Sequence, residues 1–214
     1  YVVTGAAGFI ASRLALHLAR EGHTVHACDW ANPQGCTPMD PDPASVLARL
    51  RAGRLQALAA QPGIQFRQPD LAAPGAFADW IAPLQDPIVI HLAAQAGVRH
   101  SMQAPMDFVA PNLVGFANVL HACHLQGVKK FLYASSSSVY GMRDNAPFLE
   151  DDRTDAPQSF YAATKQANEA MAYAYQSQYG LNSLGLRFFT VYGPWGRPDM
   201  APFLFTQSLR KKQP

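Results

Sequence analysis

The sequence predicts an α/β protein with a doubly wound parallel sheet and the start of a smaller second domain. Two observations lead to this prediction. Apolar runs of strand length alternate along the chain with longer segments of helical periodicity, which is the pattern of parallel strands covered by helices. The 214 residues are 49% hydrophobic and 15% charged, so the chain has a large core and enough length for one domain, or for a domain and a fragment.

The first half of the chain alternates short strands with helices. Residues 1–4 are a short apolar strand, and residues 9–21 form a helix because Ile10, Leu14 and Leu18 recur at helical spacing. The second helix, over residues 43–60, is rich in alanine and leucine and is bounded by prolines. The other elements of this half are strands at 24–29 and 64–67 and a short helix at 75–82.

The second half begins with the continuous apolar run 87–92, which is typical of a strand buried on both faces. Further helices and strands alternate at 107–126, 130–136, 159–179 and 183–190. From Gly193 the composition changes to a loop rich in glycine and proline that leaves the sheet. We therefore expect one domain over 1–190 and the beginning of a second over 191–214.

Charge and cysteine content argue against several classes of protein. A net charge of +2 disfavours a nucleic-acid binder built on a basic stripe, and no apolar stretch approaches the ~20 residues that span a bilayer. Three scattered cysteines, Cys28, Cys36 and Cys123, form no disulfide framework, so we expect a cytoplasmic protein. His121, Cys123 and His124 predict no metal site, because helix positions 121 and 123 point to different faces.

A glycine-rich turn, TGAAGFIA over residues 4–11, follows the first strand. Gly5 permits the tight turn, Gly8 lets the backbone approach a pyrophosphate, and Ala11 is small enough for close packing of helix on strand. The start of the helix then offers free N–H groups to phosphates. A purely structural turn is the alternative, but the strand–loop–helix context favours a dinucleotide-binding Rossmann fold.

Asp29 ends the second strand, 24 residues after Gly5. A carboxylate there accepts hydrogen bonds from an adenosine ribose and repels the 2′-phosphate of NADP. The next residues, Trp30-Ala31-Asn32, supply no arginine for that phosphate. The sequence therefore predicts NAD as the cofactor.

Tyr161 and Lys165 are four residues apart in YAATK and share one face of a predicted helix. A phenol with a pKa of about 10 is a poor base at neutral pH, but a nearby ammonium favours the phenolate, which can take a proton from a substrate hydroxyl. Four serines, Ser135 to Ser138, end the preceding strand at the sheet edge where ligands bind. A polar strand end with local backbone hydrogen bonds is the alternative for these serines.

Together these motifs resemble the extended short-chain dehydrogenase/reductase family, also called the NAD-dependent epimerase/dehydratase family, and within it the UDP-glucuronate 4-epimerases. The resemblance spans almost the whole chain. It rests on TGAAGFIA at 4–11, Asp29, Asp70-Leu71, HLAAQAGVR at 91–99, Asn112, YASSSSVYG at 133–141, YAATK at 161–165 and LRFFTVYGPWGRPDM at 186–200. Two departures are Ala11 in place of a third glycine, and Trp30-Ala31 in place of a polar pair.

The resemblance implies that NAD lies along the glycine loop and the strand ends. Its pyrophosphate lies on the loop, Asp29 holds the ribose, Asp70 and Leu71 flank the adenine, and Asn112 lies behind the cofactor. The residues assigned to NAD in this way are Gly5, Ala7, Gly8, Phe9, Ile10, Asp29, Asp70, Leu71, Leu92, Ala93, Ala94, Gln95, Asn112, Tyr161, Lys165 and Phe188.

The resemblance also implies the catalytic and substrate residues. The catalytic set is Ser136, Tyr161 and Lys165, with the register among Ser135 to Ser138 left open. The substrate set, expected to meet the sugar and its carboxylate, is Arg99, Ser137, Ser138, Thr190 and Arg197. A loop arginine that caps carbonyl groups is the alternative for Arg197.

The implied reaction is epimerisation at C4 of a UDP-sugar, most simply UDP-glucuronate to UDP-galacturonate, through a 4-keto intermediate. Sugar 4,6-dehydratases of the family carry an Asp-Glu pair after the catalytic hydroxyl, and the decarboxylases usually carry a Glu, where this chain has Ser137 and Ser138. Decarboxylation of UDP-glucuronate and epimerisation of a neutral UDP-hexose are the alternatives. A non-catalytic NAD-binding module is a further alternative, disfavoured by the intact tyrosine, lysine and serine.

The resemblance bears on assembly and length as well. Helices 107–126 and 159–179 carry surplus apolar and aromatic residues, and related enzymes dimerise through these helices, so we expect a homodimer that binds neither nucleic acid nor a membrane. Family members run to roughly 300 residues, so we expect a chain truncated at both ends that holds only the beginning of the sugar-nucleotide-binding domain. Such a segment is expected to bind NAD with little epimerase activity.

Overall fold

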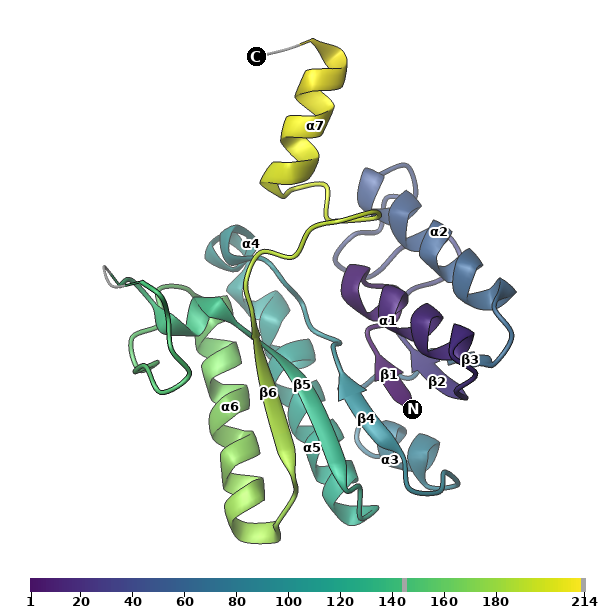
Figure 1. The fold of residues 1–214 in the computed structure, drawn as a ribbon, viewed down its shortest axis with the longest axis vertical. Coiled ribbons are helices and arrows are strands. Elements are labelled where there is room, and N and C mark those ends of the chain that lie inside the picture. The colour runs from purple at the N-terminus through teal and green to yellow at the C-terminus, as the bar shows by residue number, and fades with distance from the viewer. Residues whose placement is uncertain (144–145, 213–214) are drawn as a thin grey trace. The chain divides into compact units, whose positions relative to one another are not determined.

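The structure, a computed structural model, describes residues 1–143 and 146–212, with strands and helices in alternation (Figure 1). The strand order is β3-β2-β1-β4-β5-β6. This is the order of doubly wound dinucleotide-binding sheets, so the predicted fold class is confirmed. Packing divides the chain into two units, Tyr1–Thr4 with Pro69–Phe189, and Gly5–Gln68 with the residues from Thr190 onward. The predicted domain boundary at residue 190 stays a prediction, since these units describe packing.

The first unit holds four parallel strands: β1 (Val2–Thr4), β4 (Ile88–His91), β5 (Lys130–Ser136) and β6 (Ser183–Phe188). Every residue of β1 is buried, as are the last three of β4. Burial on both faces explains why these segments are continuous apolar runs.

The helices of the first unit are α3 (Ala76–Ile81), α4 (Val98–Gln103), α5 (Gly115–Leu125) and α6 (Phe160–Tyr179), with short turns η1 (Pro105–Phe108), η2 (Ala110–Val114) and η3 (Ser137–Tyr140). Helix α6 packs against α5 and lies along β5 and β6 (Figure 1). Phe116, Val119 and Leu120 of α5 are fully buried. The sequence predicted neither α4 nor η3.

The single helix predicted over 107–126 is wrong, because the segment consists of three helical pieces. A 3-10 turn, η1, is followed by a π-helical turn, η2, and only then by α5. Pro111 lies inside η2 and has no N–H to donate, so a regular α-helical ladder cannot continue through it. The widened turn places Asn112 in the interior, where it is 1% exposed.

In the described part of the chain, the helical run Pro105–Leu125, which comprises η1, η2 and α5, is long and apolar enough to cross a membrane by length and composition, with a mean hydropathy of 1.2. This corrects the prediction that no apolar stretch approaches such a length. Of this apolar run, 44% is buried inside the protein, and the core helix of a soluble protein can have the same length and composition. The finding is therefore weak evidence for a membrane span.

The second unit holds the parallel strands β2 (Val25–Cys28) and β3 (Ile64–Arg67) with helices α1 (Phe9–Arg20), α2 (Val46–Ala60) and α7 (Ala201–Lys211). Helix α1 packs on α2, β2 and β3. Helix α2 begins later than predicted because the Ser45 side chain accepts the N–H of Ala48 and caps it.

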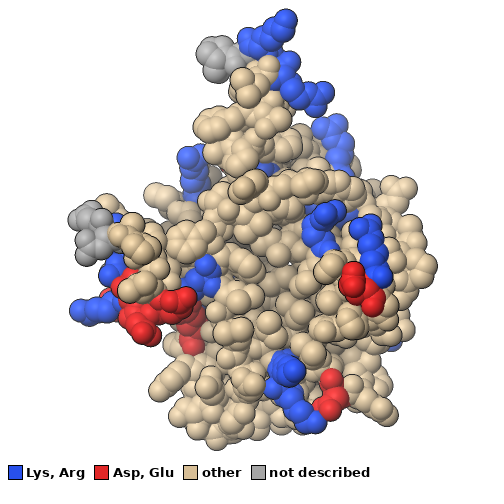
Figure 2. Space-filling view, viewed as in Figure 1, with Lys and Arg blue, Asp and Glu red and all other residues tan. Residues whose placement is uncertain are grey.

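Helix α7 was not predicted beyond a helix end at Arg210 to Lys212, and no residue of it is buried. Pro202 lies in its first turn, where a missing N–H is harmless, and Arg210 and Lys211 lie in its last turn, where they complement the helix dipole. On the face shown in Figure 2, the basic side chains of the described residues are scattered over a mostly uncharged surface.

Candidate active site

The glycine loop of the second unit presents free backbone amides at the start of α1. Gly5 has φ +74°, and the Gly8 N–H bonds the Gly5 carbonyl at 2.8 Å. A Cβ on Gly8 would lie 2.8 Å from that carbonyl oxygen, so only glycine fits. Among the described residues, the amides of Phe9 and Ile10 have no hydrogen-bond acceptor. These two N–H groups can therefore bind phosphate oxygens.

Asp29 is tied to the glycine loop. Its Oδ2 accepts the N–H of Ala7 at 2.8 Å, while the Ala7 carbonyl accepts Nη1 of Arg54 at 2.9 Å. Burial raises the pKa of Asp29, and the Ala7 N–H and the Arg51 charge oppose this shift. Both polar groups of Ala7 are thus used inside the protein, so Ala7 shapes the loop and leaves phosphate binding to the amides that follow.

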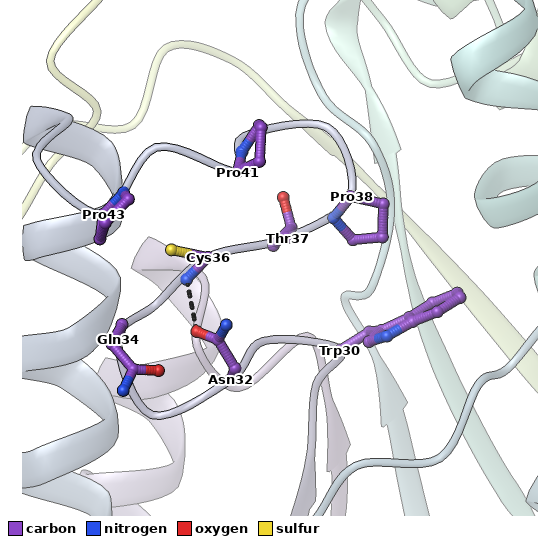
Figure 3. A pocket seen from close by; sticks show the side chains of 8 residues that line it. All are labelled: Trp30, Asn32, Gln34, Cys36, Thr37, Pro38, Pro41 and Pro43. Carbon is purple, nitrogen blue, oxygen red and sulfur yellow. Dashed lines mark hydrogen bonds between the residues drawn. The ribbon is translucent and has the colours of Figure 1, made fainter.

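The segment after Asp29 forms an open pocket of about 480 Å³ (Figure 3). Trp30 is 52% exposed and lines it, whereas Ala31 is buried and its carbonyl accepts the Gln68 amide. At these two departures from the family pattern, Trp30 presents an aromatic ring to the pocket and Ala31 packs inside. The pocket lining consists of Trp30, Asn32, Gln34, Cys36, Thr37, Pro38, Pro41 and Pro43.

The serines at the end of β5, in the first unit, divide between two environments. Ser135 donates to Glu169 of α6, which also pairs with Arg187 through two bonds of 3.0 Å. Ser136 accepts the N–H of Ser138 and donates to its Oγ, both at 3.2 Å. Because the Ser135 hydroxyl is held by a carboxylate, Ser136 is the better candidate for a hydroxyl that meets substrate.

Tyr161 and Lys165 lie in the first turns of α6, which starts where the Ser159 side chain accepts the N–H of Ala162. The ring of Tyr161 packs edge-on to Phe108 with centroids 6.1 Å apart. Lys165 is only 4% exposed, and its Nζ donates to the Ala134 carbonyl of β5 at 2.8 Å. Burial lowers the pKa of Lys165 to about 8.

Asn112 clamps the segment after β4 to α6. Its Oδ1 accepts the Gln95 N–H at 2.7 Å, and its Nδ2 donates to the Gln95 carbonyl and to Oγ1 of Thr164, both at 3.0 Å. Thr164 lies on α6 between Tyr161 and Lys165 and was not among the predicted site residues. Since both amide hydrogens of Asn112 are used, its contribution is to position residues 92–95 and the start of α6.

A second buried clamp, also missed by the sequence, joins β1 to β4. The Thr4 hydroxyl oxygen accepts the N–H groups of Leu92 and Ala93 at 3.2 and 3.1 Å, so its single hydrogen faces Nδ1 of His91 at 2.8 Å. His91 is therefore neutral, with its proton on Nε2. Burial, assisted by the Lys165 charge, lowers the pKa of His91 to about 3.

The low pKa of His91 predicts that the folded protein becomes less stable at acid pH. The folded pKa of about 3 lies below the unfolded value of about 6.5, so between these pH values the unfolded chain binds the additional proton. The free energy of unfolding should fall as pH drops below about 6.5, by up to about 1.4 kcal/mol per pH unit from this group. In denaturant titrations from pH 7 to 4, His91→Gln should show a shallower slope. The exposed control His17→Gln should not, and equal slopes for all three proteins would contradict the assignment.

Three further predicted cofactor residues make contacts within the first unit. Asp70 Oδ1 accepts the N–H of Ala72 at 2.8 Å, and the Leu71 carbonyl accepts Nδ2 of Asn118 of α5 at 2.9 Å. Phe188 ends β6 directly opposite Ser136 of β5.

The predicted substrate residues are divided between the two units, with Thr190 and Arg197 in the second unit and the others in the first. Arg99 is exposed on α4, Thr190 is exposed, and Ser137 and Ser138 are half-buried in η3. Arg197 forms a two-bond pair with Asp199, at 3.0 and 2.6 Å, so its guanidinium already holds a carboxylate. This contact replaces the carbonyl capping that was the alternative for Arg197.

The strand order and the Tyr–Lys pair behind a strand that ends in serines define a protein of the short-chain dehydrogenase/reductase type. A family model described as the NAD dependent epimerase/dehydratase family matches residues 1–213, and the chain belongs to this family.

Several characterised proteins are similar to the chain. UDP-glucuronate 4-epimerase 3 of Arabidopsis thaliana is 43% identical over 211 residues, which cover 98% of this chain and 46% of that protein. A UDP-glucuronic acid 4-epimerase from Bacillus cereus, crystallised with UDP-glucuronic acid and NAD, has a TM-score of 0.83 at 33% identity, covering 100% of this chain and 63% of that chain. A dTDP-glucose 4,6-dehydratase from Streptomyces venezuelae has a TM-score of 0.82 at 26% identity, and the match covers 99% of this chain and 62% of that chain. The chain spans 46% to 60% of the length of such curated relatives.

Proposed function

We propose that the protein is an NAD-dependent epimerase acting at C4 of a UDP-sugar, with UDP-glucuronate and UDP-galacturonate as the interconverted pair. The observation that carries the proposal is the serine run after β5, where Ser137 and Ser138 follow the catalytic Ser136. Dehydratases of the family need carboxylates at these two positions, and a hydroxyl replaces neither a general base nor a general acid at neutral pH. Fold alone does not separate the reactions, because the dehydratase and epimerase relatives match equally well.

The residues of the glycine loop fit NAD. The unpaired amides of Phe9 and Ile10 suit a pyrophosphate, and the Asp29 carboxylate suits a ribose without a 2′-phosphate. When bound, NAD supplies the acceptor and later the donor of the C4 hydride. The resemblance assigns its nicotinamide ribose to Lys165 and Tyr161, which lie on α6 of the first unit.

Proton transfer falls to Tyr161. The Lys165 ammonium favours the phenolate of Tyr161, which removes the proton of the C4 hydroxyl and returns it after the sugar has turned over. Ser136 shares the hydrogen bond to the same oxygen. Asn112 and Thr164 keep the first turns of α6 in place while the proton moves.

A glucuronate substrate brings a carboxylate that must be held away from the geometry of decarboxylation. Arg197 is suited to this task because a guanidinium binds a carboxylate through two parallel bonds, as it does with Asp199. Thr190 follows β6 and supplies a hydroxyl near the same segment.

The test is to incubate the full-length protein with UDP-glucuronate and follow products by NMR. UDP-galacturonate is the expected product. Release of CO₂ and a UDP-pentose would instead identify a decarboxylase, and turnover of UDP-glucose alone would identify a hexose epimerase. Bound NAD with no product from the full-length protein on any of these sugars would favour the non-catalytic module.

The cofactor assignment gives a specific prediction at Asp29. Asp29→Asn keeps an oxygen for the Ala7 N–H, so the loop should survive, but the charge at the ribose is lost. NAD affinity measured by calorimetry should fall about tenfold, and the preference for NAD over NADP should narrow. Asp42→Asn is the matched control, because Asp42 is exposed and caps only the Ala44 N–H. An unchanged NAD/NADP ratio in Asp29→Asn would contradict the assignment.

We also propose a homodimer through α5 and α6. Tyr173 and Tyr179 on α6 are 74% and 51% exposed, Leu125 on α5 is 61% exposed, and His124 stacks on Tyr179 with ring centroids 4.2 Å apart. These side chains form an apolar and aromatic face that suits a second copy of the chain. Sedimentation should give twice the chain mass, and Leu125→Glu should give a monomer.

A further inference from the structure

Arg54 is a buried cation to which the sequence patterns assign no role and which the proposed chemistry does not use. It lies on α2 and is only 2% exposed. Its guanidinium donates to two backbone carbonyls, that of Ala7 through Nη1 at 2.9 Å and that of Trp195 through Nη2. Its Nε is buried and finds no acceptor among the described residues.

The two carbonyls belong to two functional segments of the same unit. Ala7 lies in the glycine loop, and its N–H is held by Asp29. Trp195 lies in the segment 190–200, between Thr190 and Arg197. In Figure 1 this segment runs to α2 and then turns into α7.

Trp195 is held on α2 in a second way. Its φ is +68°, a conformation that is costly for a residue with a side chain. Its ring packs over Gly53, where an added Cβ would lie 3.4 and 3.5 Å from two ring carbons. Gly53 and Arg54 therefore hold the ring and the carbonyl of the same residue.

Burying this guanidinium is costly, because desolvation lowers the pKa of Arg54 to about 10. A residue that only filled space on α2 would be apolar and would avoid this cost. What an apolar residue cannot do is bond two carbonyls at once, one in each segment. The planar fork of arginine, with donors fixed in direction, can do so.

We propose that Arg54 is a positioning residue that couples the glycine loop to the segment 190–200, so that NAD binding orders the segment that carries Thr190 and Arg197. The inference rests on the proposed function in taking NAD as the ligand of the glycine loop. It makes sugar binding follow cofactor binding through a bridge that touches neither ligand.

The test is hydrogen–deuterium exchange of the protein with and without NAD. In the wild type, NAD should slow exchange in peptides covering both 5–12 and 190–200. In Arg54→Met, NAD affinity should fall about tenfold, and at saturating NAD only the 5–12 peptides should be protected. Arg54→Lys, which keeps the charge but not the fork, should be intermediate. A variant with a merely structural defect would exchange faster in both segments whether or not NAD is present.

A second pair of variants leaves Arg54 in place. Gly53→Leu should displace the Trp195 ring and abolish protection of 190–200 by NAD, and α2 should keep its helix because leucine favours it over glycine. Gly53→Ala is the matched control, since its Cβ makes only ordinary contact with the ring and the coupling should remain.

The outcomes separate the inference from the proposed function. Failure of the wild type to bind NAD would overturn both. Binding of NAD without a response in 190–200, or a response that persists in Arg54→Met, would overturn the coupling alone. In turnover assays, loss of coupling should raise KM for UDP-glucuronate about tenfold with little change in kcat, because Arg54 contacts no reacting atom.

Discussion

Replacing Tyr161 by phenylalanine is expected to reduce epimerase turnover by about 10²–10⁴-fold while leaving NAD affinity within a few-fold of the wild type. The substitution removes one hydroxyl and keeps the ring that packs against Phe108. The first turn of α6 is fixed by Ser159 and by the contact of Thr164 with Asn112, neither of which involves the phenol. The loss should therefore fall on kcat and not on folding.

The control for this variant is Tyr173→Phe on the same helix. Tyr173 is 74% exposed and takes no part in the site, so turnover should be unchanged. Both variants are made in the full-length protein and assayed with UDP-glucuronate under saturating NAD, and their thermal unfolding midpoints are compared. If Tyr161→Phe kept more than about a tenth of wild-type turnover, another group would be the base.

The sequence predicted the fold because its signals are local. Apolar runs, helical spacing and the glycines of residues 5–8 all act within a few positions, and the structure places the corresponding elements within a few residues of the predicted bounds. The failure at 107–126 has a local signal too, since Pro111 stands inside an otherwise helical pattern. A proline at that position should have predicted a break.

The supporting contacts of the site could not be predicted in the same way. Thr4 meets His91 across 87 positions, Asn112 meets Thr164 across 52, and Arg54 meets Trp195 across 141. No spacing rule links residues that far apart. The resemblance supplied Asn112 but not the partners that explain it.

Arg54 shows the difficulty most clearly. Helix α2 contains Arg49, Arg51 and Arg54, which look alike in the sequence as charged residues of a helix rich in alanine and leucine. Only packing distinguishes the buried Arg54, with its two carbonyl partners, from Arg51, which reaches Thr37 and Asp40. A charged residue in a helix is usually solvated, so no sequence pattern singles out one of the three arginines.

Three of these buried side chains are costly to bury in their charged form. His91, Lys165 and Arg54 are all desolvated, and burial lowers the pKa of each. Residues that serve chemistry or positioning at the expense of stability are expected at functional sites. For Lys165, which is charged at pH 7, the cost should be measurable as stability gained when the side chain is removed.

Lys165→Met is the variant in which the gain in stability and the loss of activity should be largest. Lowering the pKa from 10.5 to about 8 corresponds to roughly 3 kcal/mol of unfavourable burial of the charged form. Loss of the bond to the Ala134 carbonyl offsets about 1 kcal/mol of the gain. At pH 7 and without NAD, the variant should be about 2 kcal/mol more stable than the wild type in denaturant unfolding, whereas its epimerase turnover should fall by about 100-fold or more.

The pH dependence of this gain has a definite sign. Below pH 8 the lysine is charged in both the folded and the unfolded wild type, so the full cost of burial is present. Between about pH 8 and 10 the folded protein loses the proton first, the unfolded chain binds more protons, and wild-type stability rises with pH. The difference between Lys165→Met and the wild type should therefore shrink across this range.

The same substitution at an exposed lysine is the control. Lys129 is 74% exposed and pairs on the surface with Asp86, so Lys129→Met should change stability by no more than about 0.5 kcal/mol and should leave turnover unchanged. A Lys165→Met protein that is less stable than the wild type at pH 7 would show that the ammonium stabilises the folded chain. Burial of Lys165 would then not destabilise the folded protein, and the predicted combination of lost activity with gained stability would be wrong.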